Sequence, residues 1–293
     1  MIIAELTGGM GNQMFQYAAA KALSLHHHTE LLLDVHSFYR EVLPELEVPR
    51  NFDLTNFSGV HETLISPYHP LHNYKAYKKT PFSALIAPHK RKVYKEPFYH
   101  YDKNFLKARK DVMLKGGWQS EHYFALYKNE IRQAFAIKGE VVKRVKEISE
   151  KMRRENSVAV HIRRGDYLRL PIILAWHGVL DANHYNHAFA ALKSKNDKPL
   201  SIFYFTDDPD WVQENLCTIW PGTIASKEYQ TNGIEDFYLM SQCNHNIIAN
   251  SSFSWWAAWL NNHPGKIVVA PIHWFGNAPF DTKDLYPETW MKV

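Results

Sequence analysis

The chain has 293 residues, with 34 Lys and Arg against 30 Asp and Glu, so its net charge at pH 7 is +4. Hydrophobic residues make up 45% and charged residues 22% of it, values that exclude a disordered chain, a collagen and a coiled coil. A charge so close to neutral, without a stripe of basic and aromatic residues, gives no indication of a nucleic-acid partner.

Two cysteines, Cys217 and Cys243, are too few for a disulfide framework and favour a reducing compartment. The first residues resemble a strand and not a signal peptide, and no run of about 18 apolar residues predicts a membrane span. We therefore expect a cytoplasmic protein, with peripheral contact at the inner membrane face as the only membrane association.

The first half opens as an α/β unit. Ile2–Leu6 predicts a strand, a glycine loop follows, Met14–Leu23 has helical spacing of its apolar residues, and Leu31–Val35 predicts a second strand. Prolines scattered over residues 40–100 predict loops and short helices. Beyond them the pattern predicts a strand over 112–114 and helices over 122–137 and 140–154.

The second half alternates more regularly between strands and helices. Strands are expected over 157–162, 200–205, 246–249 and 266–270, and helices over 183–195, 211–216, 234–242 and 254–260. This alternation predicts an α/β fold with mostly parallel sheets and ligands at the carboxyl ends of the strands. We place a boundary after residue 150, which gives domains of 1–150 and 151–293.

The strongest local signal is the string HIRRGDY, His161 to Tyr167, at the end of a predicted strand. Two adjacent arginines there suit a diphosphate, because each guanidinium group can bind two phosphate oxygens at once and stays charged at physiological pH. The alternative is a surface ion pair of Arg163 or Arg164 with Asp166.

Two further strand ends carry candidate groups. Ser251, Ser252 and Ser254 precede a helix whose first N–H groups could hold phosphate, or they could simply cap that helix. Asp208 and Asp210 form an Asp-X-Asp pattern that could hold a divalent cation, although Asp210 also fits a helix cap. A carboxylate at this point could instead accept the N–H groups of a guanine ring or a ribose hydroxyl.

The loop Gly8–Gln13 resembles a phosphate loop but lacks the Lys-Ser/Thr ending of one and the third glycine of a dinucleotide site. A glycine turn that admits close approach of another group fits it better. Asn12 and Gln13 could hydrogen-bond sugar hydroxyls.

Taken together, these segments resemble glycosyltransferase family 11, the α-1,2-fucosyltransferases, in its bacterial form. The matching strings occur in the family's order: GGMGNQMFQY (8–17), GGWQSEHYF (116–124), HIRRGDY (161–167), FTDD (205–208) and NSSFSWWA (250–257). The resemblance implies a GT-B fold, in which two Rossmann-like domains face each other across a cleft. The N-terminal domain would lie on the acceptor side, and the C-terminal domain would bind the donor.

The resemblance also implies the reaction. L-Fucose would pass from GDP-β-L-fucose to the 2-hydroxyl of a terminal galactose in a cell-surface glycan such as O-antigen, with inversion and without a metal or other cofactor.

The resemblance assigns roles to the matching residues. Arg163 and Arg164 would hold the GDP phosphates, His161 would support the donor at the ribose, and Asn12 would lie near the reacting sugar. Further donor contacts would come from Asp207, Asp208, Ser251, Ser252 and Phe253, and Gln13, Gln119 and Glu121 would belong to the acceptor side or the cleft.

The general base stays open. Asp166 is the first candidate and Glu121 the second, and an early departure of the leaving group would make a strong base unnecessary. Arg163 would then carry most of the catalysis.

Three alternatives remain. They are a transferase of the same architecture with another GDP-sugar, a metal-dependent sugar-nucleotide transferase that uses Asp208 and Asp210, and a non-enzymatic carbohydrate-binding protein. A neutral glycan would have no need of the paired arginines, so the last is the least favoured.

Overall fold

The computed structural model describes residues 1–41, 48–66, 86–276 and 280–293, and of residues 166, 172 and 173 it describes only the backbone. The chain divides into two compact units. Described residues of the first unit fall within Met1–Pro44, Pro49–Ala136 and Phe280–Pro287, and those of the second within Glu45–Val48, Ile137–Pro279 and Glu288–Val293.

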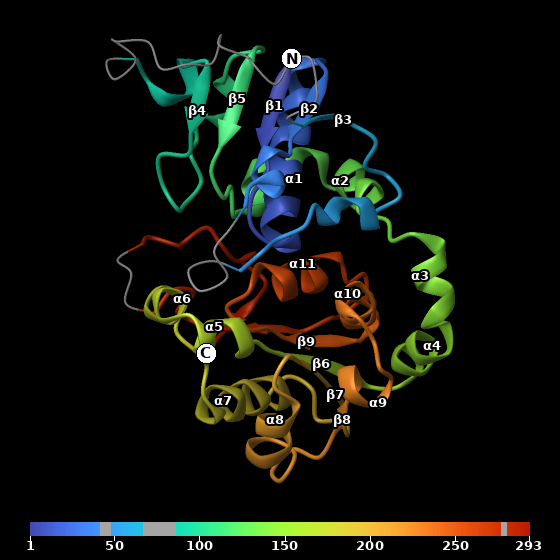
Figure 1. Ribbon diagram of the computed structural model, residues 1–293. Helices are drawn as coiled ribbons and strands as arrows, with labels where there is room; N and C mark the ends of the chain where they lie inside the picture. The colour runs from blue at the N-terminus through green and yellow to red at the C-terminus, as the bar shows by residue number, and fades with distance from the viewer. Residues whose placement is uncertain (42–47, 67–85, 277–279) are drawn as a thin grey trace. The chain divides into compact units, whose positions relative to one another are not determined.

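The first unit is built on a five-stranded sheet with the order β3-β2-β1-β5-β4, and all its strand pairs are parallel (Figure 1). The strands are β1 (Ile2–Glu5), β2 (Leu31–Asp34), β3 (Thr63–Ile65), β4 (Val93–Lys95) and β5 (Val112–Lys115), and the helices are α1 (Met10–His27) and α2 (Lys128–Ala134).

Helix α1 forms the centre of the first unit. It lies against β1, β2 and β5, and its buried alanines, among them Ala18, Ala19 and Ala22, let its backbone come close to its neighbours. It ends at His28, which takes the left-handed conformation with φ 49° and donates its N–H to the carbonyl of Leu25. Because α1 starts directly after the Gly8–Gly9 turn, its first residues lie at the carboxyl end of β1.

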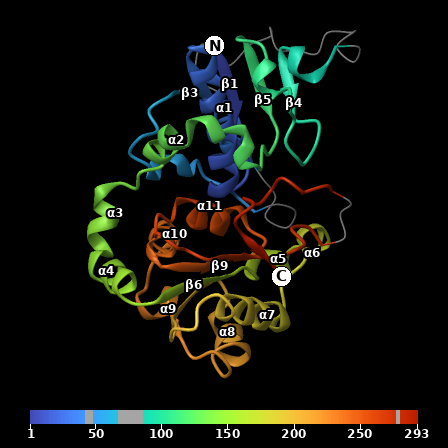
Figure 2. The ribbon, with the colours of Figure 1, turned by 180° about the vertical axis from the view of Figure 1, so that it is seen from behind.

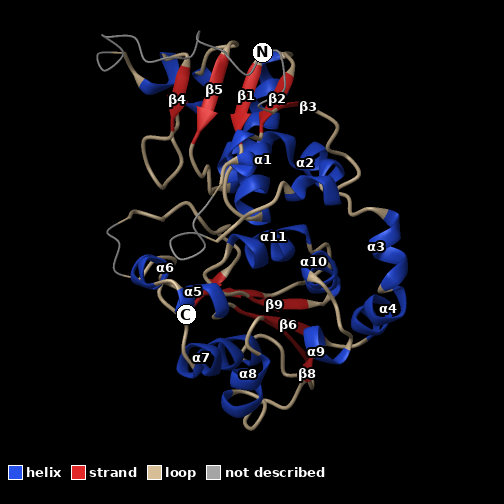
Figure 3. Ribbon diagram, viewed as in Figure 1, coloured by secondary structure: helices blue, strands red, loops and turns tan. Residues whose placement is uncertain are grey.

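The second unit is built on a six-stranded parallel sheet with the order β11-β10-β9-β6-β7-β8 (Figure 3). Its strands are β6 (Ser157–Ile162), β7 (Ser201–Thr206), β8 (Thr223–Ile224), β9 (His245–Ile247), β10 (Val268–Ala270) and β11 (Met291–Lys292). Its helices are α3 (Gly139–Arg144), α4 (Lys146–Arg154), α5 (Gly165–Arg169), α6 (Pro171–His177), α7 (Ala182–Lys193), α8 (Pro209–Asn215), α9 (Ala225–Glu228), α10 (Gly233–Gln242) and α11 (Ser252–Leu260).

Helices cover both faces of this sheet. Helices α7 and α8 lie on one face and α10 and α11 on the other, as both ribbon views show (Figure 2). Val158, Val160 and Ile162 of β6 pack in one apolar cluster with Phe189 of α7 and Val212 of α8. Because side chains alternate along a strand, His161 points to the opposite face, where its ring lies against Phe253 of α11. The parallel α/β architecture predicted for both halves is present in both units.

The predicted elements differ from the structure in both halves. The expected helix over 122–137 is two short 3₁₀ turns followed by α2, and the helix over 140–154 breaks at Val145 into α3 and α4. The sequence pattern missed β3, β4, β8, β11, α5, α6 and α9.

The division of the chain also differs from the expected boundary after residue 150. Helices α3 and α4 contact α10, so both belong to the second unit, and the change of unit comes between Ala136 and Ile137. The segment Phe280–Pro287 returns to the first unit: Ser120 donates a hydrogen bond of 2.6 Å to the carbonyl of Asp284.

In the part of the chain that is described, no helix is long and apolar enough to cross a bilayer.

Candidate active site

The second sheet changes its winding direction between β6 and β9. From β6 the chain moves through β7 and β8 on one side, and then returns to β9, β10 and β11 on the other. In open parallel sheets, ligands bind at the carboxyl ends of the strands at such a switch point. The segments after β6, β7 and β9 contain three of the predicted motifs, so the topology brings HIRRGDY, FTDD and NSSFSWWA to one sheet edge.

Arg163 and Arg164, which follow β6, pair with the two aspartates that follow β7. Arg163 Nη1 lies 2.9 Å from Asp207 Oδ2, and Arg164 Nε lies 3.0 Å from Asp208 Oδ2. The backbone N–H of Arg164 also donates to Asp207 Oδ1 at 2.9 Å. Two motifs predicted separately as donor-binding are therefore one cluster of ion pairs.

The Arg163–Asp207 pair is half-open to solvent, with side-chain exposures of 29% and 27%. Such a pair contributes roughly 0–1 kcal/mol to folding, so a bound anion can compete with it at little cost. A guanidinium also carries five N–H donors, and pairing with a carboxylate through one nitrogen is compatible with a phosphate contact.

Arg164 is held more firmly than Arg163. Its guanidinium lies 4.1 Å from the ring centre of Trp211 in α8, and its side chain is 15% exposed. Its partner Asp208 also caps α8, because Asp208 Oδ1 accepts the N–H of Trp211 at 3.3 Å. The start of α8 thereby fixes the direction of Arg164.

His161 is buried on β6, 6% exposed, with its ring 5.5 Å from that of Phe253. Burial, and in second place the charge of Arg163, lower the pKa of His161 to about 3. The imidazole is therefore neutral at pH 7, and its Nδ1 has no hydrogen-bond partner among the described residues. A neutral ring with an unsatisfied nitrogen next to Arg163 can bind a polar ligand group without adding charge.

The segment between β9 and α11 is held in place by hydrogen bonds of Asn250. Asn250 is buried and donates from its amide to the carbonyl of His177 at 2.7 Å, and its own carbonyl accepts the hydroxyl of Tyr167. Ser251 is the N-cap of α11 by backbone conformation, but its side chain makes no capping hydrogen bond. The capping interpretation of Ser251 therefore does not hold, and the predicted phosphate contacts of Ser251 and Ser252 remain predictions.

Asp166, the first candidate for the general base, lies in α5, and its side chain falls outside the described residues. The expected ion pair of the arginines with Asp166 is thus untested, while the pairs with Asp207 and Asp208 are present. The motif lies at the end of β6, as predicted, and Gly165 already starts α5 three residues after the strand ends.

The first sheet also has a switch point, between β1 and β5, because the chain moves from β1 through β2 to β3 and then places β4 and β5 on the other side. The predicted motifs 8–17 and 116–124 follow these two strands, and the first of them runs from the Gly8–Gly9 turn into α1. Gln119 Nε2 donates to Asn12 Oδ1 in the first turn of α1 at 3.0 Å and joins the two motifs.

The side chain of Gln13 joins the Gly8–Gln13 turn to the segment 51–53 through hydrogen bonds. It is fully buried, and its amide nitrogen donates to the carbonyls of Gly8 and Asn51 while its oxygen accepts the N–H of Asp53. An acceptor contact was predicted for Gln13, but in this structure its side chain holds the chain turns together.

Glu121, the second candidate for the base, begins a 3₁₀ turn, Glu121–Tyr123, and pairs with Lys128 of α2 at 3.1 Å. Its side chain is 17% exposed.

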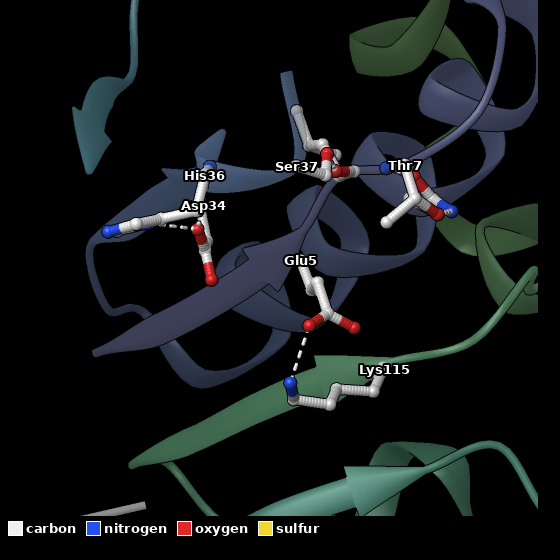
Figure 4. Close-up of polar contacts among 8 residues, drawn as sticks. Glu5, Thr7, Asp34, His36, Ser37 and Lys115 are labelled. Atoms are coloured by element: carbon white, nitrogen blue, oxygen red, sulfur yellow. Dashed lines mark hydrogen bonds and ion pairs between the residues drawn. The ribbon is translucent and has the colours of Figure 1, made fainter. Parts of the chain in front are cut away.

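Charged side chains line the carboxyl edge of the first sheet (Figure 4). The strand register pairs Asp34 with Glu5, and Lys115, at the end of the neighbouring β5, lies 2.5 Å from Glu5 through its Nζ. Asp34 Oδ1 also binds the ring of His36 at 2.6 Å. Sequence reasoning missed these residues. The strand ends were visible in the sequence, but which of them are neighbours depends on the register.

The alternative metal site is not assembled around Asp208 and Asp210. Asp208 is paired with Arg164, and Asp210 lies in the first turn of α8 with a side chain that is 87% exposed. Among the described residues, no group of at least three His, Cys, Asp or Glu side chains is arranged to hold a metal ion.

The sequence matches one family model over its full length and resembles two bacterial glycosyltransferases. The model of "Glycosyl transferase family 11" matches residues 1–293. The chain is 34% identical to an alpha-1,2-colitosyltransferase of Escherichia coli, and the match covers 100% of this chain and 99% of the relative. It is 30% identical to the O-antigen biosynthesis glycosyltransferase WbnK of the same organism, over 98% of this chain and 99% of the relative.

Among solved structures, fucosyltransferase NodZ from Bradyrhizobium matches with a TM-score of 0.52 at 15% identity, over 87% of this chain and 91% of that one. At this identity the likeness shows the fold alone. The fold is of the GT-B class, as the resemblance of the sequence to glycosyltransferase family 11 implied.

Proposed function

The chain belongs to glycosyl transferase family 11, and from this premise we propose that it is an inverting, metal-independent α-1,2-fucosyltransferase. L-Fucose passes from GDP-β-L-fucose to the 2-hydroxyl of a terminal galactose. This galactose belongs to a cell-surface glycan such as O-antigen, which is assembled in the cytoplasm at the inner face of the membrane.

The observation that supports the donor most directly is the position of Arg163 and Arg164. Both follow β6 at the switch point of the second sheet, where the start of α11 follows the neighbouring strand β9. Two permanent positive charges at this place suit a diphosphate that gains negative charge as the sugar leaves. Arg164 is fixed by Asp208 and Trp211, and the more exposed Arg163 is the group that follows the departing phosphate.

The acceptor proton needs a destination. Asp166 and Glu121 remain the candidates for a general base, and the second of them is held by Lys128 at 3.1 Å. In a dissociative transition state the proton leaves late, and stabilisation of the leaving group by Arg163 then decides the rate.

A second donor is favoured by one comparison. The 34% identical relative is described as a colitosyltransferase. Colitose is L-fucose without the 3-hydroxyl, so a site that makes no essential hydrogen bond to that hydroxyl would accept GDP-colitose. The second proposed function is therefore α-1,2-transfer of colitose by the same residues.

The test is a measurement of GDP release with GDP-fucose and with GDP-colitose, each against lactose and a panel of galactosides, with and without EDTA. The product linkage is read by NMR. An α-1,2-linked fucosyl product that forms equally in EDTA supports the first proposal. A preference of at least tenfold for GDP-colitose supports the second.

Other outcomes contradict both proposals. Loss of turnover in EDTA that Mn²⁺ restores would favour the metal-dependent alternative. Binding of galactosides without GDP release from either donor would favour the non-enzymatic carbohydrate-binding protein.

A further inference from the structure

The turn after β5 has an unusual backbone. Gly116 has φ 157°, and Trp118 has φ 53°, a left-handed conformation that a bulky side chain rarely adopts. Such a conformation persists only where the surroundings hold it. This turn leads directly to Gln119, whose amide binds Asn12.

Glu96, the residue after β4, holds the turn. Its Oε2 accepts the N–H of Gly117 at 2.7 Å and the N–H of Trp118 at 2.9 Å, and its own N–H donates to the carbonyl of Lys115 at 2.8 Å. Hydrogen bonds from two successive N–H groups to one carboxylate oxygen are charge-assisted and stronger than neutral ones.

Gly116 is the residue that permits this approach. A Cβ at Gly116 would lie 2.4 Å from the Cβ of Glu96, a distance that real atoms do not adopt. The glycine at this position therefore allows the carboxylate to lie directly against the turn.

The side chain of Trp118 is fixed from the other side. It is 1% exposed, and its ring packs against those of Tyr94, Phe105 and Tyr123 at 5.2–5.3 Å between centres. The strained backbone is thus held between an apolar cluster and one carboxylate, and of these two only the carboxylate responds to pH.

From these contacts we propose that Glu96 is a positioning residue of the glycosyl transfer. Its ionised carboxylate holds the Gly116–Gln119 turn, and the turn holds the Gln119 amide against Asn12 at the switch point of the first sheet. The role rests on the proposed function, because it assigns these two amides to the acceptor.

The surroundings of Glu96 make this support dependent on pH. Burial raises the pKa of Glu96 to about 7, against the opposing effect of the hydrogen bonds from the two N–H groups and from the Tyr123 hydroxyl, which lies 3.5 Å from Glu96 Oε1. The ionisable groups that face it are the phenols of Tyr94, Tyr99 and Tyr123, and burial raises the pKa of each of them, so they stay neutral. Asp102 lies behind them, bonded to Tyr94 at 2.6 Å. Among the described residues, no lysine or arginine is ion-paired with the Glu96 carboxylate.

The first experiment observes the turn without substrate. In the protein labelled with ¹⁵N-glycine, we expect the Gly117 amide proton to move downfield as pH rises, with a midpoint near 7, because its acceptor becomes charged. In Glu96→Gln this titration should be absent. A Gly117 amide that does not titrate in the wild type, or titrates unchanged in Glu96→Gln, would overturn the proposal whether or not a galactoside is the substrate.

The second experiment measures kcat and KM for the acceptor from pH 5.5 to 8.5, with the donor that gives turnover. We expect Glu96→Gln to lower kcat/KM by about 10- to 100-fold, as for misplacement of a binding group by a fraction of an ångström to one ångström. The inflection near pH 7 that we expect in the pH profile of kcat/KM for the wild type should be absent in Glu96→Gln. The matched control is Asp236→Asn, another buried carboxylate of raised pKa, bonded to Ser226 and Thr231 in the second unit.

A double-variant cycle separates positioning from general structural support. If Glu96 acts through Gln119, the double variant Glu96→Gln with Gln119→Ala loses no more kcat/KM than Gln119→Ala alone. Losses that multiply would show that Glu96 does not act through this amide, and the proposal would fall.

Discussion

Arg163 and Arg164 are neighbours in the chain, but their side chains have different surroundings. Arg164 is stacked on Trp211 and bonded to Asp208, while Arg163 is about twice as exposed and pairs with Asp207. The structure therefore separates a fixed positive charge from one that can follow a ligand. Sequence reasoning could identify both arginines as an anion site, but it could not assign their partners.

At the residue scale, Arg163→Ala should lower kcat by about 10²-fold or more, because a charge-stabilising donor to the leaving group is lost. Its Tm should change little, since the half-exposed pair with Asp207 contributes little to folding. The control is Lys227→Ala, which removes an exposed lysine 4.0 Å from Asp210. Turnover of Arg163→Ala within a few-fold of the wild type would contradict the role of Arg163.

At the scale of elements, the longer apolar strands of both units were predictable and the short strands and helices were not. Strands β6, β7, β9 and β10 are apolar runs flanked by polar turns, and such runs can be predicted as strands from the sequence alone. Strands β3 and β4 have three residues each and lie in the proline-rich region, where they are defined only by pairing with β2 and β5. The helix expected over 140–154 breaks because Val145 leaves the helical conformation at φ −110° and ψ 20°.

The same limit applies to the candidate site. The motifs after β6, β7 and β9 could be predicted because each follows a legible strand. Glu96 could not, because its importance depends on β4 lying beside β5, which brings its carboxylate to the N–H groups of Gly117 and Trp118. A single glutamate in a proline-rich segment gives no indication in the sequence that it contacts this turn.

Helix α8 yields a prediction at the element scale, because its cap is also a site residue. Asp208→Ala should lower the free energy of unfolding by about 1 kcal/mol through loss of the cap, and should also lower kcat, since Arg164 loses its Nε partner.

The matched control for this prediction is Asn232→Ala, which removes the capping box of α10. It should cost a similar free energy of unfolding and leave kcat unchanged well below the melting temperature. Urea unfolding and steady-state kinetics on both variants check this. Equal activity losses in the two would mean that Asp208 matters only as a cap.

At the scale of the whole molecule, two ionisable groups link folding to pH with opposite signs. The pKa of His161 is about 3 in the folded state against 6.5 as a free group, so the unfolded chain binds more protons between these values and stability falls as pH falls. The pKa of Glu96 is about 7 against 4.5, so the folded state binds more protons there and stability falls as pH rises from 4.5 to 7.

The His161 contribution can be measured by replacement. Between pH 7 and pH 5 the wild type should lose up to about 2 kcal/mol through this group, and His161→Asn should lose correspondingly less. Urea unfolding at both pH values gives the difference, with His26→Asn, at an exposed position of α1, as the control. If His161→Asn shows the wild-type difference, the ring is not held neutral by burial.

The return of Phe280–Pro287 to the first unit has a consequence for the order of synthesis. The ring of Phe280 lies 3.9 Å from that of Tyr99, and Asp284 accepts hydrogen bonds from Tyr101 and Ser120 through its side chain and its carbonyl. These contacts cannot form on the ribosome until nearly the whole chain has been translated. The unit that begins first is therefore completed only a few residues before the second, whose last segment is Glu288–Val293. A nascent chain arrested before Phe280 would carry the motifs of both units with the first unit still unfinished.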